Sequence, residues 1–275
     1  MANLIRTAKS GSDWTGNELL AFNIRVENAN TAAFFNRPEL PPVDMSDTIL
    51  DNTEKPEEPL QKDDRLFFRY LGLVEKPQSP ESHVDDFAAF ILRIFNYDSD
   101  DQDRVICQRP EFSFPMAGQR VDAKSDLCVM NENDYLLIVH EDKRSESLDD
   151  PEPQLIAEAI AAFYQNNLRR RTGGRPRLSS KYIPAITMVG SSPIFYRVPV
   201  TTTLLNALVT ATYPAEETIV LRYIPPVPNP ETYRDLGMRP LANRRIVLQC
   251  FEGFKSLLVC FFSLIERIVD TNMHQ

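Results

Sequence analysis

Hydrophobic side chains recur every three or four residues between Glu81 and Phe95, at Val84, Phe87, Ala88, Ile91, Leu92 and Phe95. This spacing lines one face of a helix, so the segment is predicted to be amphipathic. A second helix is expected at residues 152–168, which are rich in alanine, have prolines at 151 and 153 in the first turn and run into three arginines. A third, long and very apolar helix is predicted at residues 243–269.

Three stretches between the first two helices have the composition of strands, at residues 105–114, 119–130 and 135–143. The polar residues 131–134 join the last two stretches as a hairpin turn. Residues 136–139 are apolar on both faces, as a central strand covered on both sides requires. Further strands are expected at 183–189, 194–198 and 219–224. This order of elements predicts an α/β protein with a mixed central sheet flanked by helices.

The same patterns divide the chain into three parts. Residues 81–200 form the predicted core, residues 1–80 an N-terminal extension, and residues 201–275 a C-terminal elaboration packed on the same core. Within the extension, Thr15 followed three residues later by Glu18 is a capping-box signature for a short helix. Residues 44–64 contain eight acids and two lysines. They are expected to form a mobile acidic connector, because such a composition buries little apolar surface.

The 275 residues include 30 Lys and Arg against 39 Asp and Glu, a net charge of −9. This balance excludes a protein held to nucleic acid by its overall charge. The longest strongly apolar run spans ten residues, about half of the ~20 that a transmembrane helix needs. The N-terminus also lacks the apolar stretch of a secretory signal. We therefore expect an intracellular protein, cytoplasmic or nuclear, with no membrane contact.

One segment departs from this acidic balance. Residues 169–181 carry six cations and no acid, namely Arg169, Arg170, Arg171, Arg175, Arg177 and Lys181. A local basic patch of this kind is predicted to contact the phosphates of a nucleic acid, DNA or RNA. The alternative is that the first three arginines are cations favoured at a helix C-terminus, followed by a solvated loop.

Acidic side chains gather near the ends of the second and third predicted strands. Asp126 opens the apolar end of one strand and Glu141 closes the next, fifteen residues later. Because side chains alternate along a strand, Glu141 and Lys143 share a face. Two carboxylates suit Mg²⁺ or Mn²⁺, and a lysine beside them can assist an attacking water. The predicted chemistry is hydrolysis of phosphodiester bonds.

The flanking helices offer further polar groups for this site. Glu81 or Asp85 on the preceding helix is a candidate for an additional ligand. Gln154 and Glu158, four residues apart on the following helix, are candidates for a phosphate contact or for support of the ligands. His140 is predicted to be a core histidine rather than a catalytic one.

Two alternatives remain open in the same region. Asp122-Ala123-Lys124 repeats the acid-x-Lys pattern, so Asp122 is the alternative first acid. Cys128 lies within a predicted strand and is interpreted as a buried apolar residue rather than a nucleophile.

Asp126, the triplet Glu141-Asp142-Lys143 and the helix start Pro153-Gln154-Leu155 together resemble the motifs of the PD-(D/E)XK nuclease superfamily. The resemblance covers roughly residues 81–190. It implies a restriction-endonuclease-like α-β-β-β-α-β core and a magnesium-dependent nuclease. Asp126 and Glu141 would be the metal ligands, Lys143 the catalytic lysine, and Gln154 the glutamine that RecB-like members place on the following helix.

The chain departs from that family pattern at two positions. Ser125 stands where the first motif has proline, and Glu158 stands where RecB-like members have tyrosine. Over its whole length the chain also resembles an uncharacterised set of mushroom-forming fungal proteins, which implies no activity. The alternative function is therefore a catalytically inactive binding or scaffold protein on the nuclease fold, forming a homodimer through the C-terminal helix.

Overall fold

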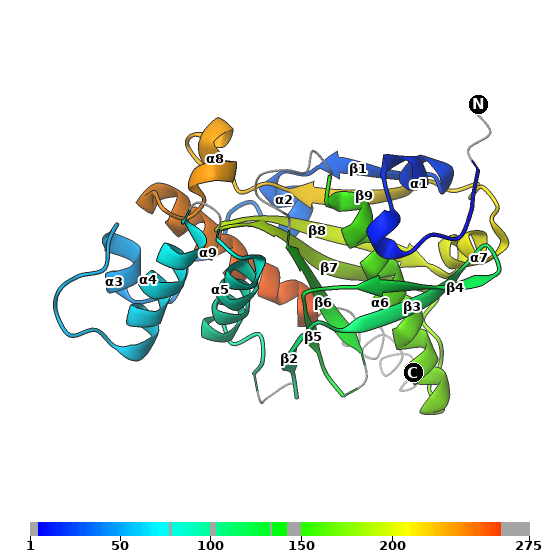
Figure 1. The fold of residues 1–275 in the computed structure, drawn as a ribbon, viewed down its shortest axis with the longest axis horizontal. Coiled ribbons are helices and arrows are strands. Elements are labelled where there is room, and N and C mark those ends of the chain that lie inside the picture. Colours follow the sequence, from blue (N-terminus) through cyan, green and yellow to red (C-terminus); the bar gives the residue numbers. More distant parts are fainter. Residues whose placement is uncertain (1–4, 77–78, 100–102, 133, 142–149, 260–275) are drawn as a thin grey trace, which may run out of the picture.

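A seven-stranded mixed sheet forms the centre of the computed structural model, which describes residues 5–76, 79–99, 103–132, 134–141 and 150–259. Its strands run in the order β1-β9-β8-β7-β6-β5-β2 (Figure 1). Their bounds are Ile24–Asn28 (β1), Val105–Gln108 (β2), Leu127–Met130 (β5), Tyr135–Glu141 (β6), Ser180–Val189 (β7), Ser192–Thr201 (β8) and Thr218–Tyr223 (β9). The pairs β1/β9 and β6/β7 are parallel, and the other neighbours are antiparallel.

Helices cover both faces of this sheet, as strand β6 illustrates. Ile138 packs in the apolar cluster formed with helix α6 (Glu152–Thr172), whereas Leu137 and Val139 pack in the cluster formed with helix α5 (Glu81–Ile94). A strand with buried side chains on both faces needs a continuous apolar run, which this stretch has. The predicted α/β class, with a mixed sheet between helices, is confirmed.

The first two predicted strands are each broken in two. Residues Glu111–Met116 (β3) and Gln119–Lys124 (β4) form a separate two-stranded sheet, which continues into β2 and β5 only through a bend. At the bend, Arg109 has a φ of 50° and donates its N–H to the carbonyl of Asp126 at 2.7 Å. Since Pro110 has no N–H to donate, the ladder is interrupted there. The prediction of continuous strands at 105–114 and 119–130 was wrong at this point.

The N-terminal part packs against one edge and one end of the sheet. Helix α1 (Gly16–Ala21) begins with the predicted capping box, in which Thr15 and Glu18 each bond the other's backbone. The further helices of this part are α2 (Thr31–Phe35), α3 (Asp47–Asp51) and α4 (Lys62–Val74), with a 3-10 turn at Gly11–Asp13. Figure 1 shows α3, α4 and α5 gathered at one end of the molecule.

The acidic segment 44–64 differs from the expected connector. It contains α3 and the first turn of α4, and the Ile49 side chain is buried in the main apolar cluster. The guanidinium of Arg244 donates to the carbonyls of Ile49 and Asn52 at 2.8 and 2.5 Å. A distant arginine therefore orders a segment whose own composition favours disorder.

The C-terminal part consists of α7 (Thr202–Thr210), α8 (Pro230–Leu236) and α9 (Leu241–Lys255), followed by a 3-10 turn at Ser256–Val259. The predicted helix at 243–269 is shorter in the structure, because α-helical geometry ends at Lys255; its last part lies outside the described residues. The hydroxyl of Ser256 donates to the Gly253 carbonyl at 2.7 Å at this end. In the described part of the chain, no helix combines the length and apolar character that crossing a bilayer requires.

Candidate active site at the end of β6

Asp126 lies at the bend between β4 and β5, beside the C-terminal end of β6. Leu127 pairs with Val139, so the preceding Asp126 comes next to His140. The neighbouring Ser125 is buried, and its hydroxyl donates to the Val139 carbonyl at 2.7 Å. The pairing of β5 with β6 and the bend therefore fix the backbone position of Asp126.

Two of the predicted side chains lie close to His140, and a third contacts one of them. Its Nδ1 lies 3.4 Å from Asp126 Oδ2 and 3.2 Å from Glu158 Oε1. On helix α6, Gln154 donates from Nε2 to Glu158 Oε1 at 3.1 Å. The bend, strand β6 and helix α6 therefore bring Asp126, Glu158 and Gln154 into one polar network, with the imidazole at its centre.

The side chains of this network become more buried from Asp126 through His140 to Glu158. The exposed fraction of the side chain falls from 32% at Asp126 to 12% at His140 and 0% at Glu158. Burial raises the pKa of the Glu158 carboxyl, the imidazole of His140 opposes that rise, and the charge of Asp126 adds to it. The Glu158 carboxyl is therefore harder to ionise than a carboxyl in water.

A further carboxylate approaches from the opposite face of the sheet. Burial raises the pKa of Asp85, on α5, to about 6, and the charge of Asp126 contributes to the rise. The guanidinium of Arg109 acts in the opposite direction, and Glu81 adds a smaller repulsion. Asp85 and Asp126 thus repel each other across the end of the sheet, and a hard cation near both oxygens would relieve that repulsion.

The predicted second ligand is only partly described. The backbone of Glu141 ends β6 and pairs with Met188, whereas its side chain and the whole of Lys143 lie outside the described residues. Among the residues that are described, no group of three or more His, Cys, Asp and Glu side chains is arranged to hold a metal ion. Metal binding by Asp126 and Glu141 stays a prediction.

The predicted basic patch divides into two groups. Arg169 donates to the Tyr135 hydroxyl at 2.9 Å, while Arg170 and Lys181 lie 3.5 and 3.6 Å from the buried Asp134 carboxylate. These three cations have partners inside the fold. The other three cations extend from the end of α6 and the following loop, where Arg171 and Arg177 are exposed and Arg175 is partly exposed.

The sequence interpretation predicted His140 to be a core histidine and did not place it in the site. Strand alternation places it on the same face as Ile138, toward α6, and Glu158 of that helix lies 3.2 Å from its Nδ1. That pairing of a strand histidine with a helix acid is the signal that would have found it. Cys128 is fully buried as expected, and burial raises the pKa of its thiol to about 12, so it is a poor nucleophile.

No family model matches the sequence, and a search of curated proteins finds no significant relative.

Proposed function

We propose that this chain is a magnesium-dependent phosphodiesterase that hydrolyses nucleic acid, built on a restriction-endonuclease-like core. The observation that carries the proposal is the polar network of Asp126, His140, Glu158 and Gln154 at the end of β6. The order α5, β2, β5, β6, α6, β7, with β6 parallel to β7, supports the expected α-β-β-β-α-β core. The β3–β4 pair is then an insertion between its first two strands.

The chemistry of the donors supports a hard divalent cation. Asp126 and Asp85 offer carboxylate oxygens, and Glu141 follows at the end of the adjacent strand. Oxygen ligands of this kind suit Mg²⁺, with Mn²⁺ as a substitute. A bound Mg²⁺ would polarise the phosphate and lower the pKa of a water.

The residues of the chain would then have distinct tasks. Asp126 and Glu141 would hold the ion, and Lys143 would orient the attacking water. His140 lies 3.4 Å from Asp126, and Glu158 lies 3.2 Å from His140. Both would act as positioning residues, His140 by orienting the Asp126 carboxylate and Glu158 by orienting the imidazole. Arg171, Arg175 and Arg177 would contact the phosphate backbone away from the reacting bond.

Cleavage of labelled single- and double-stranded DNA and RNA tests the proposal, with Mg²⁺, Mn²⁺ or a chelator. We expect cleavage that needs the metal and falls by ~100-fold or more in Asp126→Asn and in Lys143→Ala. Asp122→Asn is the matched control, since Asp122 is exposed on β4, in the separate two-stranded sheet. Its rate should stay within ~2-fold of wild type.

A thermal shift assay separates loss of chemistry from loss of metal. Mg²⁺ or Mn²⁺ should raise the melting temperature of the wild type and not that of Asp126→Asn. Cleavage that survives both Asp126→Asn and Lys143→Ala would remove the assignment.

The second candidate is a nuclease-fold protein that binds nucleic acid without cutting it. One observation favours it: a pocket of about 360 Å³ beside α4 is lined by Lys and Arg side chains and does not include Asp126. This candidate predicts retained oligonucleotide binding with no metal-dependent thermal shift and no cleavage.

A further inference from the structure

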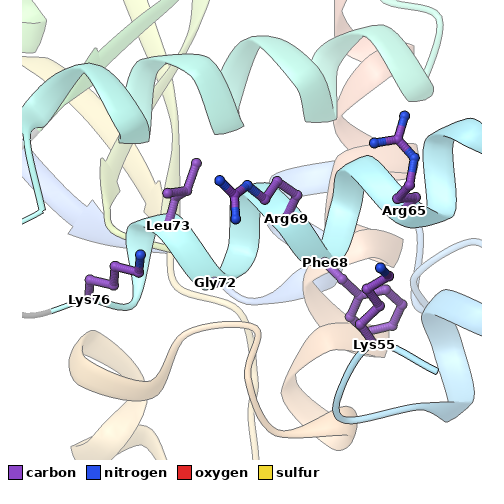
Figure 2. A pocket seen from close by; sticks show the side chains of 7 residues that line it. All are labelled: Lys55, Arg65, Phe68, Arg69, Gly72, Leu73 and Lys76. Atoms are coloured by element: carbon purple, nitrogen blue, oxygen red, sulfur yellow. The ribbon is translucent and has the colours of Figure 1, made fainter. Parts of the chain in front are cut away.

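A groove runs along helix α4, and none of its lining residues belongs to the network around Asp126. Seven residues line it, namely Lys55, Arg65, Phe68, Arg69, Gly72, Leu73 and Lys76. Figure 2 shows Arg65, Phe68, Arg69, Gly72 and Leu73 along helix α4, Lys76 just past its end, and Lys55 from the preceding loop, beside Phe68. The groove encloses about 360 Å³, the lower part of the range for small-molecule sites.

The spacing of the lining residues makes the groove continuous. Residues 65, 69 and 72 are separated by four and three positions, so they form one stripe on α4, and Lys76 extends this stripe just past the end of the helix. Gly72 lies in the middle of this stripe, and a side chain added there would meet no atom within 4 Å. The absence of a side chain at Gly72 therefore leaves space between Arg69 and Lys76.

The groove is strongly basic although the chain is acidic. Four of its lining residues are Lys or Arg and none is Asp or Glu, while the whole chain has a net charge of −9. In the described part of the chain, the side chains of Lys55, Arg65, Arg69 and Lys76 make no ion pair or hydrogen bond. All four are exposed, so their charges face the solvent and the groove.

This arrangement has a cost within the protein. Arg65 and Arg69 are like charges four residues apart on a helix, an arrangement that destabilises helices. Lys76 follows the C-terminal end of α4, where a cation is favoured by the helix dipole. The dipole explains Lys76, but it does not explain the two arginines or Lys55.

The chemistry of the lining determines what the groove can accept. Lys and Arg side chains only donate hydrogen bonds, and Phe, Leu and Gly side chains offer no polar atom. A ligand with many acceptors and no donors therefore matches the lining best. Phosphate groups have this property, and the fork of an arginine bonds them in pairs. A peptide would bring backbone N–H groups for which the lining side chains have no acceptor.

The groove is long enough to contact more than one phosphate group of a bound chain. Val74, the last residue of α4, follows Arg65 by nine positions, which corresponds to ~14 Å along the helix, and Lys76 lies beyond it. One strand of a duplex places its phosphates ~3.4 Å apart along the axis. Phe68 is buried at the floor and does not offer an exposed ring for base stacking.

We propose that the α4 groove, formed by Lys55, Arg65, Arg69 and Lys76 around Gly72, binds a linear array of linked phosphate groups. The array is the backbone of a nucleic-acid strand or a polyphosphate chain. Recognition goes through charge and arginine forks and is independent of base sequence. This inference does not rest on the proposed nuclease activity, because it uses none of the residues near Asp126.

Binding of a fluorescent oligothymidylate in a chelator tests the inference without cleavage. Arg65→Gln/Arg69→Gln should weaken binding at least ~10-fold and reduce the slope of log affinity against log salt by about two. Lys62→Gln is the matched control, because Lys62 is an exposed cation on the first turn of α4 that does not line the groove. It should stay within ~2-fold of wild type at moderate salt.

Competition by tripolyphosphate, inorganic phosphate and polyglutamate identifies the ligand chemistry. Oligothymidylate binding with displacement by tripolyphosphate supports a strand, whereas binding of tripolyphosphate alone, lost in the double variant, supports a polyphosphate. Equal competition by inorganic phosphate overturns the linked array, and equal competition by polyglutamate overturns the preference for phosphate. Unchanged affinity for both phosphate probes in Arg65→Gln/Arg69→Gln overturns the site. Asp126→Asn should bind like wild type, which separates this result from the nuclease assay.

Discussion

Arg244 is the largest side chain with almost no solvent exposure in the described structure, and its replacement by methionine should strongly destabilise the fold. From α9 its guanidinium donates to the carbonyls of Met238, Ile49 and Asn52 at 3.1, 2.8 and 2.5 Å. It also lies 5.2 Å from the ring centre of Phe67. A single cation thus connects the C-terminal helix with the segment around α3.

The expected loss follows from the groups that Arg244→Met leaves behind. A buried carbonyl without a donor costs ~1–3 kcal/mol, and the lost cation–π contact adds ~0.5–1 kcal/mol. Methionine keeps an apolar stem of similar length, so the change tests the guanidinium rather than the packing. After local relaxation, water can replace the guanidinium at some of these carbonyls, which reduces the loss. We therefore expect the free energy of unfolding to fall by ~3–5 kcal/mol.

Urea denaturation at equilibrium measures this loss, and hydrogen exchange shows where it acts. The midpoint should fall at a similar slope, and amides in residues 47–53 should exchange faster. Arg245→Met is the control, because Arg245 is 53% exposed and pairs with Asp51 at the surface. That change should cost less than ~1 kcal/mol. A loss below ~1 kcal/mol for Arg244→Met, with unchanged exchange at 47–53, would refute the reasoning.

Two further changes test the site and the backbone. Burial and the charge of Asp126 raise the pKa of Asp85 from 3.8 to about 6. The folded state therefore binds the Asp85 proton more tightly than the unfolded chain does, and the stability of the fold decreases as the pH rises from 3.8 to about 6. Asp85→Asn should therefore stabilise the protein by ~1–2 kcal/mol at pH 8, after discounting for solvent screening, and leave it unchanged near pH 3; thermal melts at both pH values check this, and an equal effect in the exposed neighbour Asp86→Asn would contradict it. Gly237 has a φ of 46°, and an added Cβ would lie 2.2 Å from Ser191 Oγ, so Gly237→Ala should cost ~2–4 kcal/mol in urea melts. Gly174→Ala, with a φ of 68° but open space around it, should cost only ~1 kcal/mol, and equal losses would show that the contact with Ser191 does not matter.

Local sequence patterns predicted a helix or strand correctly where the residues that stabilise it lie within that same element. The capping box at Thr15 and Glu18 begins α1 as predicted, because both partners lie within one turn. The helical spacing in residues 81–95 produced α5, and the alanine-rich segment after Pro151 produced α6. The apolar run in residues 136–139 predicted a strand covered on both faces, which β6 is.

The bend at Arg109 and Ser125 depended on partners in two different strands. Pro110 marks a break within residues 105–114, although the residues on both sides favour strands. The division was decided by the bonds that join Arg109 to Asp126 and Ser125 to Val139. The same bonds place Asp126 beside His140. The sequence therefore predicted Asp126, Glu158 and Gln154 as site residues, but not the position of His140 among them.

The sequence by itself determined the helices, the central strands and the residue types available for chemistry, because hydrophobic periodicity and capping act over a few residues. Only the tertiary structure decided that His140 lies between Asp126 and Glu158, that Arg244 orders the acidic segment, and that the cations of α4 surround a groove. Each of these depends on groups distant in the chain. Their energies are defined only once the core has brought the elements together and removed water from between them.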